Sequence, residues 1–153
     1  MLITEIEAIE LRVPGWDASR LDGSYDTCLV RIHTDEGEVG ISETDSLPGI
    51  IRSIINANPS HTGARGLREL LIGQNPSDIE GLWRQMYEGT FYIGRRGVVI
   101  HAISAIDIAV WDLKGKIENK TIAELLGKPK RDSILAYGTV YPLGRTTDEV
   151  RMN

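Results

Sequence analysis

The sequence predicts an α+β domain in which a three-stranded antiparallel meander precedes a bundle of helices. Apolar and polar residues alternate over residues 9–13 and 27–34, as in strands that turn one face to solvent. The short glycine-bearing turn Asp35–Glu38 joins the second strand to the third, which continues the alternation through Ile41, and so few residues form an antiparallel hairpin. After position 46 the apolar residues recur every three or four positions, which is typical of helices.

The first strand is expected over residues 2–13, with a bulge after Ile6, where the phase of the alternation shifts. Pro14 and Gly15 end this strand, and a polar loop follows over residues 16–26. Cys28 stands in the apolar run of the second strand, so we interpret it as a small core residue rather than a nucleophile.

Helices are expected to begin near Leu47, Ala64, Ser77 and Val98. Ser77-Asp-Ile-Glu80 matches a capping box, in which the serine hydroxyl accepts a hydrogen bond from the glutamate amide. The last of these helices is the longest and carries an apolar stripe broad enough for a central core helix, formed by Val99, Ala102, Ile103, Ile106, Ala109, Val110, Leu113 and Ile117.

The end of the chain carries three further signals. Thr121-Ile-Ala-Glu124 is a second capping box, and Gly127 suits a left-handed helix end. Residues 132–141 read as a strand, and a further helix is expected to start at Thr146.

Composition excludes several classes of protein. A length of 153 residues suits one domain, and the net charge of -5 argues against a nucleic acid or an anionic membrane as partner. A single cysteine rules out an internal disulfide, and neither a secretory signal nor a membrane-spanning run is visible, so a cytoplasmic protein is expected.

His33, His61 and His101 are scattered and predict no ligand cluster. We therefore assign no catalytic or metal-binding residue within this chain.

The segment 102–127 resembles a signature stretch of the mandelate racemase/muconate lactonizing enzyme group of the enolase superfamily. Val110 and Thr121 depart from the usual residues, both mildly. Asp107 and Asp112 are interpreted as hydrogen-bonded partners that fix a neighbouring loop, rather than as catalysts. The matching positions are Ala102, Ser104, Ala105, Ile106, Asp107, Ala109, Asp112, Leu113, Gly115, Lys116, Ile122, Leu125, Leu126 and Gly127.

This resemblance implies an enolase N-terminal-domain-like capping domain over residues 1–131 and the first strand of a truncated TIM barrel within 132–153. In this group two loops of the capping domain close over the barrel and choose the substrate; the matching segments here are 16–26 and 43–49. Arg95 and Arg96, in the loop before the long helix, resemble members that dehydrate acid sugars. The implied substrate-binding residues are Trp16, Arg20, Asp22, Tyr25, Asp45 and Ser46 from the loops, and Thr139 and Tyr141 from the barrel strand. Asp45 or Ser46 also fits a plain N-cap of the helix that follows.

The resemblance also implies the chemistry of the complete enzyme. The group removes the proton alpha to a carboxylate and stabilises the enediolate with Mg²⁺, which calls for carboxylates on barrel strands after Asn153. The expected function is therefore the capping domain of a Mg²⁺-dependent acid-sugar dehydratase, inactive alone, whose partners are the missing barrel and further copies of the chain in a homo-oligomer. The alternatives are a racemase or cycloisomerase of the same group, or a stand-alone interaction domain without activity.

Overall fold

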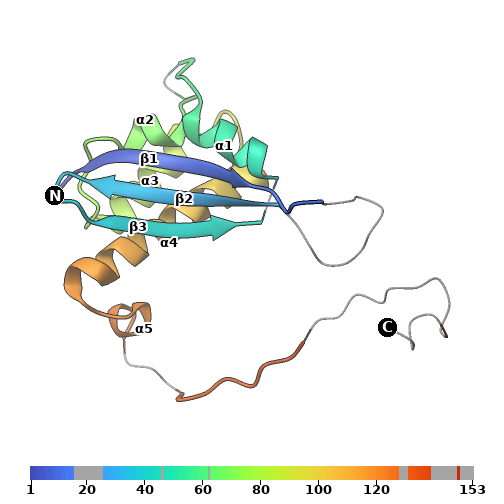
Figure 1. The fold of residues 1–153 in the computed structure, drawn as a ribbon. Coiled ribbons are helices and arrows are strands. Elements are labelled where there is room, and N and C mark those ends of the chain that lie inside the picture. The colour runs from blue at the N-terminus through green and yellow to red at the C-terminus, as the bar shows by residue number, and fades with distance from the viewer. Residues whose placement is uncertain (16–25, 46, 62, 128–130, 139–147, 149–153) are drawn as a thin grey trace.

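The computed structural model describes residues 1–15, 26–45, 47–61, 63–127, 131–138 and 148. Three strands come first and helices follow, which confirms the predicted α+β architecture. Figure 1 shows the strands side by side with the helices behind them. The elements in chain order are β1 (Ile3–Leu11), β2 (Thr27–Thr34), β3 (Val39–Thr44), α1 (Pro48–Asn56), α2 (Leu67–Leu71), α3 (Ile79–Gly89), α4 (Val98–Glu118) and α5 (Ile122–Leu125).

The sheet is the expected antiparallel meander, in the order β1-β2-β3. The bulge predicted after Ile6 lies earlier, between Ile3 and Glu5. β1 stays paired with β2 on both sides of this irregularity, through Ile3 with Thr34 and Glu5 with His33. At Ile3 the chain following α2 bonds to β1 as well, because the Ile3 amide donates to the Gln74 carbonyl at 3.0 Å and the Gly73 amide donates to the Ile3 carbonyl at 2.8 Å.

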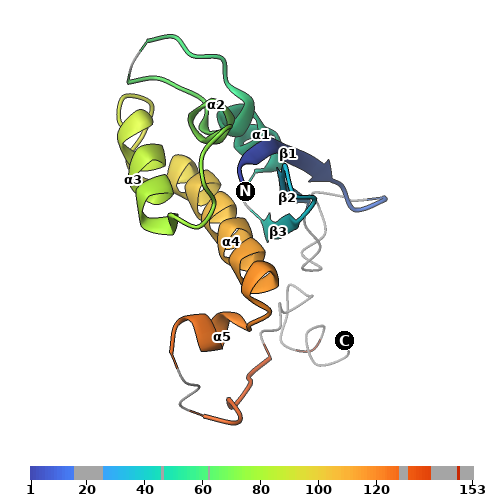
Figure 2. The same cartoon turned by 90° about the vertical axis from the view of Figure 1, so that its left-hand side faces the viewer.

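The helices cover one face of the sheet and leave the other to solvent, as Figure 2 shows. Even-numbered residues of β2 point into the core, where Cys28 is fully buried. Odd-numbered residues point outward, and on that side the Glu7 carboxylate lies 2.7 Å from His33 Nε2. The buried core joins the sheet to α1, α2, α3 and α4 through Ile3, Ile6, Val30, Ile32, Ile51, Ile55, Leu67, Leu70, Leu71, Ile79, Leu82, Met86, Ile103, Ile106 and Leu113, among others.

The closest approach between layers is a seam between β3 and α4. A Cβ atom added to Gly40 would lie 2.1 Å from the Ala109 carbonyl oxygen, so only glycine allows this spacing. The Ser42 hydroxyl donates to the Ala105 carbonyl within the same seam. Small residues on both elements therefore let the strand and the helix backbone touch directly.

The outer edge of β3 is closed by two charged side chains of α4. The Ile41 amide donates to Asp112 Oδ2 at 2.8 Å, and Lys116 Nζ donates to the Val39 carbonyl at 2.8 Å. Asp112 and Lys116 also form an ion pair at 2.6 Å. The predicted role of Asp112 as a hydrogen-bonded partner is correct, but it fixes a strand rather than a loop. These bonds occupy edge groups that would otherwise invite another strand.

The helix ends confirm one predicted cap and correct another. Thr121 and Glu124 form the expected capping box at the start of α5. At α3, however, the N-cap residue is Asp78, whose carboxylate accepts from the Gly81 amide at 3.0 Å, so the capping box predicted at Ser77 is wrong. The Ser77 amide instead donates to the Asn75 side chain at 2.9 Å.

Residues 131–138 do not form the strand expected over 132–141. Ile134, Leu135 and Tyr137 are 82%, 97% and 89% exposed. A strand is held by hydrogen bonds to a neighbouring strand, and no such neighbour lies beside this segment in the described part of the chain. Residues 139–141, and all but Asp148 of the helix expected from Thr146, lie outside the described residues.

From the close contact at Gly40 we predict that Gly40→Ala lowers the free energy of unfolding by about 3 kcal/mol, because the added methyl group forces β3 away from α4. Equilibrium unfolding in urea measures this loss. The matched control is Gly49→Ala, where the new Cβ would meet Glu10 at an ordinary 3.6 Å within α1. This control should be neutral or slightly stabilising, since alanine favours a helix over glycine by about 1 kcal/mol. Equal losses in the two variants would show that the seam has no special role.

Candidate functional site

Two chain connections leave the sheet at the same end. Leu11 pairs with Thr27 and Cys28 pairs with Thr44, so the last residues of β1 and β3 lie beside the first residues of β2. Figure 1 shows these ends together on the right of the sheet. The connection from β1 to β2 and the segment after β3 therefore start side by side, although about thirty residues separate them in the chain.

Side-chain hydrogen bonds tie the bases of these connections together. The Asp26 carboxylate accepts from Arg12 Nε at 2.9 Å and from the Val13 amide at 3.2 Å, which closes the base of the first loop. The Thr27 hydroxyl donates to Glu43 Oε2 at 2.6 Å and lies 3.0 Å from the Thr44 carbonyl oxygen. Thr27 therefore links the base of the first loop to the end of β3.

Of the predicted substrate-binding residues, only Asp45 lies within the described residues; Trp16, Arg20, Asp22, Tyr25, Ser46, Thr139 and Tyr141 lie outside them. Asp45 is exposed and follows β3 directly, at the sheet end just described. Its alternative role as a helix cap is not found, because Leu47 is the N-cap residue of α1 and no side chain caps that helix. The Asp45 carboxylate therefore stays available at the base of the second loop.

Helix α4 lies beside this sheet end. It runs antiparallel to β3, so its N-terminal half lies next to Thr44. A shallow pocket of about 240 Å³ lies between the two elements. It is lined by Glu43, Thr44, His101, Ser104, Ala105 and Ile108. Glu43 was expected in the second loop, whereas the pocket beside α4 and the bonds of Asp26 and Thr27 were not predicted. The available signal for these two residues was their position at the end of the predicted first loop and directly after it.

The described residues offer no cluster of metal ligands. No group of three or more His, Cys, Asp or Glu side chains in the described part of the chain could hold a metal ion. Burial raises the pKa of the Cys28 thiol, which keeps it protonated and unreactive. None of the helices within the described residues is long and apolar enough to cross a membrane. What the described residues show at this sheet end is the anchoring of two loop bases beside α4.

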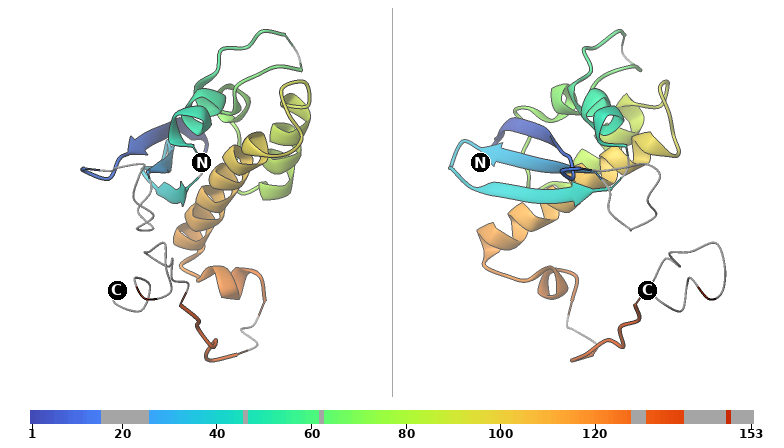
Figure 3. Two further views of the ribbon diagram at one scale, coloured as in Figure 1. Left: turned by 90° about the vertical axis from the view of Figure 1, so that its right-hand side faces the viewer. Right: turned by 45° about the vertical axis from the view of Figure 1, so that its right-hand side comes forward.

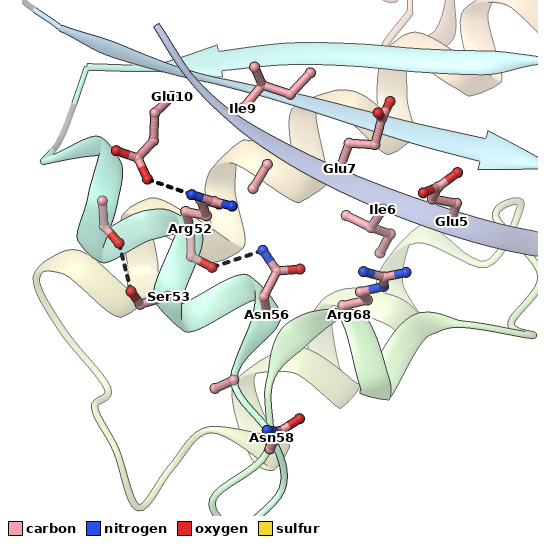
Figure 4. A pocket seen from close by; sticks show the side chains of 13 residues that line it. Glu5, Ile6, Glu7, Ile9, Glu10, Arg52, Ser53, Asn56, Asn58 and Arg68 are labelled. Carbon is pink, nitrogen blue, oxygen red and sulfur yellow. Dashed lines mark hydrogen bonds and ion pairs between the residues drawn. The ribbon is translucent and has the colours of Figure 1, made fainter. Parts of the chain in front are cut away.

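A second hollow, a polar groove of about 750 Å³, lies between β1 and α1. Figure 4 shows its side chains, and most of their bonds serve the fold. Arg52 pairs with Glu10 at 3.2 Å, the Ser53 hydroxyl donates to the Gly49 carbonyl, and the Asn56 amide donates to the Arg52 carbonyl. We therefore do not assign this groove as the functional site.

Comparison with known proteins identifies the family of this domain. The sequence profile described as "Mandelate racemase / muconate lactonizing enzyme, N-terminal domain" matches residues 11–127. The chain is 35% identical over 114 residues to an L-rhamnonate dehydratase from Saccharopolyspora erythraea, which covers 74% of this chain. The chain spans only 27% to 30% of the length of the curated relatives that it matches.

Solved structures agree with this assignment. The 3,6-anhydro-D-galactonate cycloisomerase from Zobellia galactanivorans superimposes with a TM-score of 0.70 at 32% identity, over 85% of this chain and 33% of that one. A mandelate racemase/muconate lactonizing enzyme from a marine actinobacterium, solved in complex with magnesium, gives a TM-score of 0.66 at 31% identity, over 82% of this chain and 32% of that one. Both solved proteins are about three times as long as the matched region.

From the hydrogen bonds of the Thr27 hydroxyl we predict that Thr27→Val lowers the free energy of unfolding by about 1 kcal/mol. Valine keeps the shape of the side chain and removes the hydroxyl bonds to β3. Urea unfolding measures the loss. Ser53→Ala is the matched control, since its exposed hydroxyl bonds only within α1 and its removal should cost less than about 0.5 kcal/mol. An unchanged stability in Thr27→Val would show that the two bases are not coupled through this residue.

Proposed function

Since the chain belongs to the mandelate racemase/muconate lactonizing enzyme family, as its N-terminal domain, we propose that it is the substrate-capping domain of a Mg²⁺-dependent acid-sugar dehydratase. The curated relative that is 35% identical and named L-rhamnonate dehydratase supports an acid sugar as substrate. In this proposal the chain selects and encloses the substrate, and the reaction takes place in a second domain, of which residues 132–153 would be the start.

The single observation that carries the proposal is the convergence of the two loop bases at one end of the sheet. Loops anchored there start side by side, so they could close together over a ligand. Arg20 in the first loop would pair with the substrate carboxylate, and Trp16, Asp22 and Tyr25 would contact its sugar hydroxyls. Closure of both loops would exclude water from the reacting carbon.

The second loop would contribute Asp45 and Ser46, and Asp45 has the exposure that this role requires. Thr139 and Tyr141 would line the same pocket from the first barrel strand, in the region 132–153 that we assign to the second domain. The described residues of the chain do not fit a Mg²⁺ site, so the ion would be held in that second domain. There it would stabilise the negative charge that develops when the proton alpha to the carboxylate is removed.

A cycloisomerase or racemase of the same family is the second candidate. The match to the 3,6-anhydro-D-galactonate cycloisomerase, at a similar level of identity, favours it. Both reactions start with removal of the same proton, so the capping domain would serve either one. The products separate them, because loss of water leaves a 2-keto-3-deoxy acid whereas cycloisomerisation or racemisation keeps the mass of the substrate. A stand-alone interaction domain is the third candidate, and it requires a chain that needs no second domain.

A chimera tests the proposal. Residues 1–127 of this chain would replace the matching segment of the Saccharopolyspora dehydratase, and a panel of sugar acids would be assayed for 2-keto-3-deoxy products with and without Mg²⁺. We expect Mg²⁺-dependent dehydration by the chimera and none by the 153-residue chain. Arg20→Ala in the chimera should raise KM about 100-fold or more, because a charge-assisted contact to the carboxylate is lost.

The control for this experiment is Arg84→Ala, on α3 and away from the loop bases, which should leave KM unchanged. A folded chimera that accepts no sugar acid, or a 153-residue chain that dehydrates one alone, would contradict the proposal. A product with the mass of its substrate would favour the second candidate.

The exposed segment after α5 has a consequence for the chain in isolation. Ile134, Leu135 and Tyr137 are apolar and almost fully exposed, and such segments associate. We therefore predict that the 153-residue chain self-associates as its concentration rises, and that a chain ending at Gly127 is monomeric. Light scattering over a range of concentrations measures both. A 153-residue chain that stays monomeric at all concentrations would contradict this.

A further inference from the structure

The two edges of the three-stranded sheet are treated differently by the rest of the domain. The outer edge of β3 is closed, because Asp112 and Lys116 of α4 bond to its backbone. The outer edge of β1 is closed only at its start, where Ile3 bonds to residues 73 and 74. Over residues 5–10 this edge borders the polar groove instead, as Figure 3 and Figure 4 show.

The register of the sheet determines which backbone groups face this groove. The Thr34 amide donates to the Glu38 carbonyl in the turn to β3, so the backbone groups of Thr34 point away from β1. These directions alternate along a strand, so the odd-numbered residues of β2 bond to the odd-numbered residues of β1 over residues 5–11. The even-numbered residues of β1 turn their N–H and C=O groups outward, and within the described residues no hydrogen bond to another segment reaches those of Ile6, Ala8 and Glu10.

A strand edge of this kind accepts an extended peptide by strand addition. The peptide would lie about 4.8 Å from β1 and would exchange main-chain hydrogen bonds with Ile6, Ala8 and Glu10. The groove beside this edge has a volume of about 750 Å³ and follows it from Glu5 to Glu10. Successive side chains of the peptide would point alternately to solvent, beside the outer face of the sheet, and toward α1 and α2.

Two charges without partners stand on these two sides of the edge. Glu5 is exposed on the outer face of the sheet, and Arg68 is exposed on α2. Neither forms an ion pair within the described residues, whereas Arg52 is paired with Glu10. Figure 4 shows Glu5 and Arg68 at the opposite end of the groove from that pair. A basic residue next to an acidic residue in the peptide would therefore find a partner on each side.

The groove also continues past Arg68. A second hollow of about 520 Å³ shares Asn56, Asn58 and Arg68 with it and adds Pro59 and Ile72. Ile72 is 39% exposed although it is apolar. An apolar side chain of the peptide, on the same side as the acidic residue, would cover it.

A second copy of the chain fits the β1 edge poorly. In a two-fold contact β1 would meet another β1, which brings the glutamates of both copies together, namely Glu5, Glu7 and Glu10. The exposed segment 134–137 of another copy is apolar, whereas Glu5 and Arg68 call for charged side chains. The charges at this edge therefore act against self-pairing and favour a peptide of mixed charge.

We propose that the β1 edge binds an extended peptide segment of another protein, which adds to the sheet as a fourth strand. The segment would carry a basic residue that pairs with Glu5, an adjacent acidic residue that pairs with Arg68, and an apolar residue that covers Ile72. The proposal does not depend on the reaction that the longer protein catalyses.

Amide hydrogen exchange followed by NMR tests the proposal on the 153-residue chain. The probe is a capped peptide of about eight residues in which lysine and glutamate alternate between valine ends. We expect the peptide to slow exchange of the outward amides of Ile6, Ala8 and Glu10 about tenfold or more. The amides of Glu7 and Ile9, which already bond to β2, should be unchanged. The same peptide with N-methylated backbone amides is the matched control, and it should give no protection because its donors are lost.

Charge reversal at Arg68 provides a second readout, measured as the Kd of the fluorescein-labelled peptide by anisotropy. Arg68→Glu should weaken binding about tenfold, because it places a like charge beside the glutamate of the peptide. A peptide whose glutamates are replaced by lysines should bind this variant as tightly as the first peptide binds the unchanged chain. Arg84→Glu is the matched control, since Arg84 is exposed on α3 outside the groove, and it should leave the Kd unchanged.

Several results would overturn the proposal. One is a peptide that binds while the three outward amides exchange as fast as before, because it would then be held by charge alone. The absence of binding at about 1 mM peptide is another, as is an unchanged Kd in Arg68→Glu. Slow exchange of these amides without peptide, in a concentrated chain or in the chimera, would also count against it, because a second copy or the remainder of the longer protein would then fill the edge.

Discussion

The contact between β3 and α4 is the constraint on which the rest of the structure depends. Gly40 allows the backbone of the strand to reach the Ala109 carbonyl, and the Ser42 hydroxyl bonds to the Ala105 carbonyl one turn away. Asp112 and Lys116 then bind the outer edge of the strand. Since a three-stranded sheet has two edges and one apolar face, this single helix closes an edge and most of the face together.

The same contact also places α4 beside the end of the sheet at which the two chain connections begin. Because α4 is held antiparallel to β3, its N-terminal half stands beside Thr44, at the end of the sheet from which both loops extend. The bonds of Asp26 and Thr27 hold the loop bases to one another and to the strand. A scaffold that fixes two loop bases at one end of its sheet is compatible with relatives that are named as a dehydratase and a cycloisomerase.

The residues of the family signature mainly hold the fold of the domain together. Ala105, Ala109, Asp112 and Lys116 all act in the seam, and Thr121 with Glu124 caps the helix that follows it. These residues identify the family through its fold, because their side chains bond and pack within the domain. Asp107 is the exception within the signature, since the described part of the domain gives it no partner.

The sequence by itself determined the order of strands and helices, the core positions of β2, most of those of α4 and the capping box at Thr121, because periodicity and local capping are properties of neighbouring residues. Ile117 of the predicted stripe on α4 is instead 39% exposed. It misplaced the bulge of β1 and the cap of α3 by a few residues, since the bulge lies where Ile3 also bonds to residues 73 and 74, and Asp78 rather than Ser77 accepts from the first turn of α3. Only the tertiary structure decided that Asp112 and Lys116 close the edge of β3 and that Thr27 joins two loop bases. Those facts depend on contacts between residues far apart in the chain, and no local pattern records which distant surface a side chain will meet.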